Sequence, residues 1–298
     1  MIQRLLSPVF FLLLSIPLLN GGQNPVPDSL RDLARLKQNS NPARLGVLQK
    51  MLEERGIPYE LQAFDSHRSP HGRTKGTNMI VTFGKGPQEI LLGAHYDALE
   101  LPGGRMVDGM IDNGAAAFIL VRVAEALKSR DLHHRVRIVF FDMEEIGLVG
   151  SQAYVTAHKP EIEAAIILDI AGFGDAVGYG FGRAKETVQI QKALLMACAD
   201  QLLTCVDSPN YPTSDDRSFQ KADIPVVSIS FSPRLAAIQA WLMLNGGENS
   251  GMKRDFVPPV FNIIHTSEDN LGKIEPAALD LEYKLVINTL FKLDGALE

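Results

Sequence analysis

Residues 89–97 read EILLGAHYD, an unbroken apolar run at 90–94 that ends in the polar residues His95, Tyr96 and Asp97. A short run of this kind, without polar alternation, is typical of a strand buried on both faces of a sheet. Four more short, mainly apolar runs lie at 79–83, 136–141, 164–168 and 226–229. The chain is therefore expected to build a sheet of buried strands.

Helical periodicity separates these runs. Apolar residues recur on one face of 114–128, and a similar stripe marks 276–293. Two more helices are expected before the first run, at 29–37 and 42–54. Strands that alternate with helices predict an α/β fold in which helices sandwich a mainly parallel sheet.

The composition is that of a folded protein with a large core. Of 298 residues, 46% are hydrophobic and 21% are charged, which excludes disordered, collagen-like and coiled-coil chains. The 29 basic and 35 acidic residues give a net charge of −6, so no nucleic-acid partner is expected. No repeat or low-complexity linker divides the chain, and residues 23–298 are expected to form one domain.

Residues 1–22 differ from the rest of the chain. Arg4 precedes an apolar run at 5–19 that Pro8 and Pro17 interrupt. A membrane-spanning helix needs about 20 apolar residues, so we interpret this segment as a secretory signal peptide. The alternative is an uncleaved anchor, because Leu-Asn-Gly-Gly is a poor cleavage site. We expect a secreted or periplasmic protein, with no membrane contact beyond such an anchor.

The sequence contains two cysteines, Cys198 and Cys205. Two are too few for a disulfide framework or a thiolate zinc site. They can pair with each other across seven positions or remain free thiols, and both readings stay open.

Residues capable of chemistry directly follow three of the apolar runs. They are His95, Asp97, Glu144, Glu145 and Asp169. The carboxyl ends of parallel strands meet at one edge of a sheet, and ligands bind there in open α/β sheets. Three such endings are therefore expected to form one site.

Two further residues can join this site. Asp112 lies in the glycine-flanked turn GMIDNG just before the helix at 114–128, where an N-cap is its alternative role. His265 follows an apolar pair and precedes the acids Glu268 and Asp269.

A convergent cluster of His95, Asp112, Glu145, Asp169 and His265 would place several carboxylates in one cleft. Their repulsion and desolvation would be costly without a cation. Mixed imidazole and carboxylate ligands suit zinc, with manganese or cobalt as substitutes. Because the ligands are too many for one tetrahedral ion, we expect two zinc ions that share a bridging carboxylate.

The two adjacent glutamates, Glu144 and Glu145, can have different roles. Neighbouring side chains in extended backbone point in opposite directions. One glutamate can therefore bind metal while the other faces the bound water.

Five segments in order resemble the co-catalytic zinc aminopeptidases, whose relatives include bacterial leucyl aminopeptidases, glutamate carboxypeptidase and the glutaminyl cyclases. Each segment alone is a weak signal, but five in order are a strong one, and the order and spacing agree across roughly residues 40 to 293. The segments are GAHYD at 93–97, GMIDNGAAA at 109–117, FFDMEEIGLVGS at 140–151, ILDI at 167–170 and IIHTSEDNLGKIEPAAL at 263–279.

The resemblance implies a fold of the zinc-exopeptidase type, a three-layer α/β/α sandwich with a mixed, mainly parallel sheet. It also implies a ligand set. In that set, His95 and Asp169 bind one zinc, Glu145 and His265 bind the other, and Asp112 bridges both. A cis peptide bond between Asp112 and Asn113 is a further feature of such proteins.

The resemblance also implies the catalytic roles. Glu144 would be the general base that deprotonates a metal-activated water, which then attacks the scissile carbonyl of a peptide. Asp97 would hold the second ring nitrogen of His95, as metal-bound imidazoles usually require. The expected activity is that of an aminopeptidase acting on peptide substrates.

One position departs from the pattern. Many relatives carry Ser-Asp-His where this chain reads Ser214-Asp215-Asp216, so Asp216 stands in place of a histidine. The five metal positions are unaffected, but substrate contacts are expected to differ. The adjacent Arg217 is expected to pair with Asp215 or Asp216, or to bind a substrate carboxylate.

Two other functions compete with the exopeptidase. A glutaminyl cyclase-like acyltransferase would use one working zinc, although the cyclases carry extra residues before the Gly-Ser that here follows Glu145 closely. A non-catalytic binding ectodomain would usually lack ligands, whereas this chain has all five and the base. The preferred side chain, the end of the peptide that is trimmed and the oligomeric state are not predicted.

Overall fold

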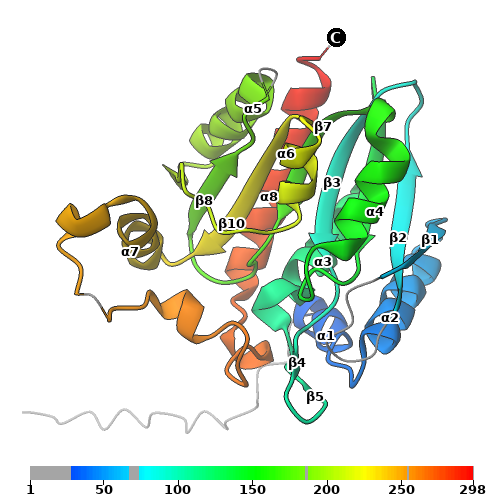
Figure 1. The fold of residues 1–298 in the computed structure, drawn as a ribbon. Coiled ribbons are helices and arrows are strands. Elements are labelled where there is room, and N and C mark those ends of the chain that lie inside the picture. The colour runs from blue at the N-terminus through cyan, green and yellow to red at the C-terminus, as the bar shows by residue number, and fades with distance from the viewer. Residues whose placement is uncertain (1–27, 67–73, 185–186, 254, 298) are drawn as a thin grey trace, which may run out of the picture.

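The computed structural model describes residues 28–66, 74–184, 187–253 and 255–297. Within these residues, one large sheet has the strand order β1-β2-β6-β3-β7-β10-β8-β9 (Figure 1). Its strands are β1 (Glu60–Asp65), β2 (Lys75–Phe83), β3 (Glu89–His95), β6 (Arg135–Phe141), β7 (Ile162–Leu168), β8 (Ala176–Phe181), β9 (Thr204–Asp207) and β10 (Val226–Ser232). A separate ribbon pairs β4 (Glu100–Leu101) with β5 (Arg105–Met106).

The centre of the large sheet is parallel and its flanks are mixed. Strands β6, β3, β7 and β10 pair in parallel, while β2 pairs antiparallel with β6, and β8 pairs antiparallel with β10. Every residue of β3 is buried, as its continuous apolar run predicts. The expected mixed, mainly parallel sheet is confirmed.

Helices cover both faces of the sheet. They are α1 (Asp28–Ala34), α2 (Asn41–Glu54), α3 (Ala115–Leu127), α4 (Val149–His158), α5 (Thr187–Asp200), α6 (Asp216–Lys221), α7 (Arg234–Asn245) and α8 (Pro276–Asp294). Along β3, Ile90 and Leu92 pack in the core cluster that contains α2, α3, α5 and α8, whereas Leu91 packs with α4 and α6. This alternation of side chains makes the sheet the middle of three layers.

The helices expected from periodicity are present with small shifts at their ends. The prediction for 42–54 corresponds to α2, whose amide at Ala43 donates a hydrogen bond to the hydroxyl of Ser40 over 3.3 Å. The helix expected at 29–37 ends at Ala34. The predicted helices at 114–128 and 276–293 correspond to α3 and α8.

The two cysteines form a disulfide. Cys198 of α5 and Cys205 of β9 have Cα atoms 6.5 Å apart and are bonded through their sulfur atoms, which settles the alternatives left by the sequence. The bond joins a helix on one face of the sheet to a strand at its edge.

The expected signal peptide at 1–22 lies outside the described residues, and the assignment of 23–298 to one domain stays a prediction. Among the described residues, no helix combines the length and apolar character that crossing a bilayer requires.

Candidate metal centre

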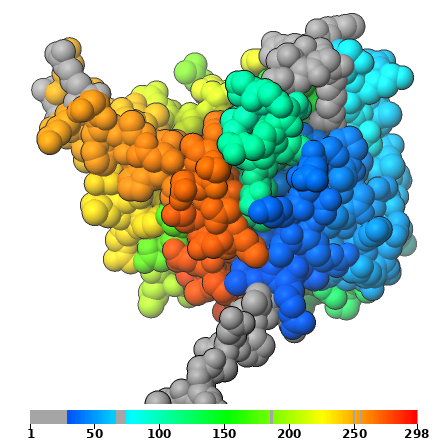
Figure 2. All heavy atoms as spheres, turned by 90° about the horizontal axis from the view of Figure 1, so that it is seen from below, coloured from blue at the N-terminus to red at the C-terminus, as the bar shows by residue number. Residues whose placement is uncertain are grey.

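Three parallel neighbours in the sheet deliver side chains to one edge. His95 is the last residue of β3, Glu144 and Glu145 follow β6, and Asp169 follows β7 directly. Seen from this edge, the orange segment that contains His265 lies beside the teal segment of β4 and β5, which leads into the turn of Asp112 (Figure 2).

His95, Asp112 and Asp169 form the first donor group. The Nε2 atom of His95 lies 3.1 Å from Oδ1 of Asp112 and 3.6 Å from Oδ1 of Asp169. One potential ligand atom from each of the three residues falls within 4.8 Å of the others. This group lies deep, because the side chain of His95 is only 1% exposed.

Asp112, Glu145 and His265 form the second donor group. The Nε2 atom of His265 lies 3.1 Å from Oδ2 of Asp112 and 3.2 Å from Oε2 of Glu145. The His265 side chain is 52% exposed, so this group lies at the rim. Asp112 offers one oxygen to each group, as a bridging carboxylate would.

The buried polar atoms fit divalent cations. His95 Nε2 and Glu145 Oε1 are buried and make no hydrogen bond within the described part of the chain. Buried polar atoms usually have partners, and a cation would supply one to each. Two imidazoles with carboxylates, and no thiolate, form a donor set that zinc accepts. The residues therefore fit metal ions in both donor groups.

The side chains of the two donor groups shift one another's pKa values. Burial raises the pKa of Glu145 to about 7, and the nearby charge of Asp112 adds to this shift. Hydrogen bonds to Asp112 and Glu145 raise the pKa of His265 to about 11. Although burial opposes it, the imidazoles of His265 and His95 lower the pKa of Asp112. Protonated imidazoles thus balance the acids, a role that bound cations would take over.

Glu144 belongs to neither donor group, but its carboxyl group interacts electrostatically with His95, Asp112 and Asp169. It keeps part of its surface exposed to solvent. Burial raises its pKa well above the ordinary value, and the charges of Asp169, Asp215 and Asp112 contribute to this shift. Its position suits a group that exchanges protons.

Asp97 contacts the second ring nitrogen of His95, as expected, and it also supports the two glutamates. The Nδ1 atom of His95 contacts the backbone oxygen of Asp97 at 3.1 Å, whereas the Asp97 carboxylate is 3.5 Å away. That carboxylate accepts hydrogen bonds from the amides of Glu144 at 3.0 Å and Glu145 at 3.2 Å. Its main contacts therefore fix the backbone of the two glutamates.

Two supporting residues were not predicted from the sequence. The carboxylate of Asp269 accepts hydrogen bonds from the amides of Met110, Ile111 and Asp112 at 2.9, 2.6 and 3.0 Å. The buried guanidinium of Arg44 donates to backbone oxygens of the loops that carry His95 and Asp112. Asp269 lies four residues after His265, which is a usable signal; Arg44 has none, because it resembles any helical arginine.

The turn that carries Asp112 has an irregular backbone. The peptide bond between Asp112 and Asn113 is cis, as the resemblance implies. The side-chain Nδ2 of Asn113 donates to the backbone oxygen of Leu168 at 2.8 Å, next to Asp169. Asp112 does not cap α3, whose N-cap is Gly114.

The position that departs from the resemblance is enclosed. Asp216 is buried and accepts hydrogen bonds from the amide of Ser214 at 3.2 Å and from the side chain of Gln220 at 2.5 Å. Arg217 donates to Gln220 at 3.2 Å. Among the described residues no ion pair within 4.0 Å joins Arg217 to Asp215 or Asp216. The charge of Arg217 nevertheless partly offsets the rise in the pKa of Asp216 that burial causes, so the expected pairing with Asp216 is present only as an electrostatic interaction.

A pocket adjoins the first donor group. Asp169 forms part of its lining, and the other walls are mainly apolar, with Phe231, Trp241, Leu244 and Val260 among them. The space within the pocket, including the part that is open to solvent, is about 610 Å³. Walls of this kind suit an apolar group of a ligand.

Residues 78–290 match the model of Peptidase family M28. The chain is 28% identical over 196 residues to the "Alkaline phosphatase isozyme conversion protein" of Escherichia coli (strain K12), covering 57% of each protein. It is 25% identical over 217 residues to "Leucine aminopeptidase 2" of Trichophyton rubrum, covering 66% of this chain and 40% of that one. The chain thus spans about half the length of these relatives.

A solved structure of Porphyromonas gingivalis glutaminyl cyclase shares the fold, with a TM-score of 0.68 and 19% identity. The alignment covers 89% of this chain and 96% of the cyclase.

Proposed function

The chain belongs to peptidase family M28, and on this basis we propose that it is a zinc-dependent exopeptidase, specifically an aminopeptidase that removes the amino-terminal residue of a peptide. The observation that carries the proposal is the pair of donor groups that share Asp112, with Glu144 beside them. The similarity to a leucine aminopeptidase supports it.

The metal ligands follow from the two groups. His95 and Asp169 would hold one zinc, Glu145 and His265 would hold the other, and Asp112 would contribute an oxygen to each. When bound, zinc supplies a Lewis acid that polarises the scissile carbonyl and stabilises the developing negative charge.

Glu144 would carry the proton. In the proposed reaction its carboxylate accepts a proton from the attacking water and then donates it to the departing amine. This requires a fixed backbone and a partly solvated side chain, and Glu144 has both, because its amide is bonded to Asp97.

The pocket beside Asp169 favours trimming at the amino end. Among its described lining residues there is no lysine or arginine that could bind a terminal carboxylate. The surrounding acids would instead attract a free ammonium group, and the apolar walls would accept an apolar side chain.

A second candidate is an acyltransferase that cyclises amino-terminal glutamine with one zinc. Its support is the match over 96% of the length of a glutaminyl cyclase structure. About one zinc per chain and a pyroglutamyl product would favour the cyclase over the peptidase.

The proposed location is outside the cytoplasm. The Cys198–Cys205 disulfide supports it, because such bonds persist in oxidising compartments. Export of the full chain would be tested by cell fractionation.

The activity is tested with a panel of aminoacyl anilides, with and without a chelator. We expect leucyl anilide to be hydrolysed, the chelator to abolish hydrolysis, and added zinc to restore it. Hydrolysis of carboxyl-terminal residues from blocked peptides, with none from free amino ends, would contradict the aminopeptidase assignment.

A further inference from the structure

The wall of the pocket beside Asp169 includes β9, the outermost strand on one side of the sheet. Val206 of β9 and Ser208 just after it line the pocket, together with Gly178 of β8. Strand β9 has four residues, lies at the end of the strand order and pairs in parallel with β8 alone. A short edge strand with one parallel partner is held weakly by its own ladder.

Helix α7, which packs against β8, β9 and β10 and forms another wall of the pocket, buries few of its residues. Among its described residues only Ala236 and Ala237 are buried. Its last residue, Asn245, donates to the hydroxyl of Ser208 at 2.9 Å and accepts from the amide of Asn210 at 2.8 Å. The end of α7 is thus tied to the segment after β9, and these two parts of the pocket depend on each other.

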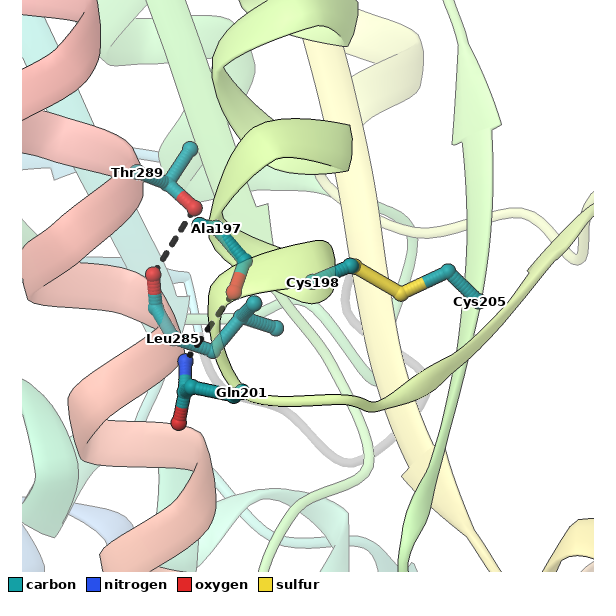
Figure 3. The surroundings of a disulfide bond; sticks show 6 residues. All are labelled: Ala197, Cys198, Gln201, Cys205, Leu285 and Thr289. Atoms are coloured by element: carbon teal, nitrogen blue, oxygen red, sulfur yellow. Dashed lines mark hydrogen bonds between the residues drawn. A yellow bond between two sulfur atoms is a disulfide. The ribbon is translucent and has the colours of Figure 1, made fainter.

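The disulfide connects this unit to the rigid core. Cys198 belongs to α5, which buries Ile190, Leu194 and Ala197 and packs against α8. Figure 3 shows the sulfur bridge extending from α5 to Cys205 in β9, on the side of α5 away from α8.

The tethered residue and the pocket residue are neighbours. Successive side chains along a strand point to opposite faces. Cys205 therefore points to α5 while Val206 points into the pocket. Because the disulfide fixes the position of Cys205, it also fixes how far the side chain of Val206 extends into the pocket.

From this arrangement we infer that the Cys198–Cys205 disulfide determines side-chain specificity, because it holds the β9 wall where a large apolar side chain meets it. The inference rests on the proposed function and deepens it: the substrate class is a peptide with a large apolar amino-terminal residue. With the disulfide cleaved, β9 moves and that residue binds less tightly, whereas a small residue such as alanine is affected little.

The test uses the double variant C198A/C205A and the single tryptophan of the chain, Trp241, which lines the pocket. Its fluorescence is titrated in chelator-treated protein with 3-methylbutan-1-ol, which carries the side chain of leucine, and with ethanol. We expect the Kd of 3-methylbutan-1-ol to rise about tenfold in the variant, as for lost burial of a branched alkyl group, with little change for ethanol.

Kinetics give a second reading. In the zinc-loaded variant, KM for leucyl anilide should rise about tenfold, while KM for alanyl anilide and kcat for both should change less than about twofold. The control is V155A, which perturbs a buried residue of α4 on the other face of the sheet and should leave both KM values unchanged.

If the double variant does not fold, the same readings are taken on wild-type protein treated with dithiothreitol. In that exchange the protein disulfide is reduced to two thiols and the dithiol is oxidised to a cyclic disulfide. Equal changes for the two alcohols or substrates, or none, would overturn the inference. Absence of hydrolysis in the wild type would refute the proposed function, while the alcohol titration would still test the role of the disulfide.

Discussion

Glu144 and Glu145 are adjacent in sequence but occupy different surroundings. Glu145 belongs to the second donor group and points at His265, whereas Glu144 belongs to neither group. Both amides are fixed by the carboxylate of Asp97. One residue of separation would thus divide the proposed metal ligand, Glu145, from the proposed proton carrier, Glu144.

This division predicts different losses on substitution. E144Q should retain zinc and lower kcat for leucyl anilide by about 100-fold to 10,000-fold, since the amide cannot accept the proton. E145Q should instead lower the zinc content. Metal analysis of both purified variants, paired with the anilide assay, checks the difference. Full activity of E144Q would rule out its assigned role.

Asp269 positions Asp112 through the backbone. It accepts three consecutive amide hydrogens of the turn that carries the shared ligand. D269N should weaken zinc binding by about 10-fold to 100-fold, the usual effect of losing an outer partner of a ligand.

The matched control for D269N is the neighbouring acid. The side chain of Glu268 is 62% exposed and pairs with Lys273 at 3.4 Å, so E268Q should bind zinc normally. Competition with a coloured chelator measures both affinities. Equal zinc affinities of D269N and E268Q would contradict the proposed role of Asp269 in positioning Asp112.

Backbone conformation is the part of the site that residue identity did not predict. Met143, Ile170 and His265 have φ angles of 59°, 65° and 61°, a left-handed region that side chains other than glycine seldom adopt. Met143 precedes Glu144, Ile170 follows Asp169, and His265 is itself a proposed ligand. These angles therefore change the direction of the backbone at the site. No local sequence pattern predicts positive φ angles at these residues, because the surrounding fold imposes them.

At the scale of elements, the central strands and the two long helices were predictable. Strands β3, β6 and β7 each end in a mainly apolar run, and the residues at or just after these ends include His95, the Glu144-Glu145 pair and Asp169. The sequence therefore predicted which residue types would meet at the site. It did not predict the pocket, because α7 and β9 give weak periodic signals.

Strand β8 shows why some elements escaped prediction. Its sequence AVGYGF contains Gly178 and Gly180, and glycine weakens a strand pattern. A Cβ at Gly180 would lie 2.3 Å from the Cβ of Tyr211. The glycine serves a tertiary contact with a segment 31 positions away, which sequence patterns do not reveal.

Helix α8 contains a buried acid whose ionisation should affect stability. Glu282 accepts a hydrogen bond from the amide of Gly172 at 2.9 Å, and burial raises its pKa to about 8. Between about pH 5 and pH 8 the folded protein keeps a proton that the unfolded chain has released. Stability from this group is therefore complete at low pH and is lost as the pH rises through 8.

The variant E282Q removes this dependence, because the amide stays neutral. In chelator-treated protein, wild type and E282Q should be similarly stable at about pH 5, while the variant should be more stable at about pH 9 by on the order of 4 kcal/mol. Urea denaturation at both pH values measures the difference. A difference that does not change with pH would contradict an ionisable Glu282 in the core.

At the scale of the whole molecule, the fold brings together proposed metal ligands that are far apart in the chain. His95 and His265 are separated by 170 positions, yet both contact Asp112 at 3.1 Å. Ions bound there would link strand ends to the loop before α8. Metal should therefore stabilise the complete fold, not one loop.

Removal of metal should lower the melting temperature. Ligand at about 100 times its Kd stabilises a protein by about 3 kcal/mol, which corresponds to roughly 5 to 10 °C for a domain of this size. Calorimetry with zinc and with a chelator makes the comparison, and D112A should show no zinc-dependent shift. An unchanged melting temperature of the wild type would argue against tight binding.

The most direct test of the central claim is a zinc titration of metal-stripped protein in which leucine release from a leucyl peptide is followed. We predict no release without metal and a rise that saturates near about two zinc ions per chain, as expected for a site with two metals. Release that is independent of zinc, or absent at every zinc concentration, would contradict a zinc aminopeptidase built on His95, Asp112, Glu145, Asp169 and His265.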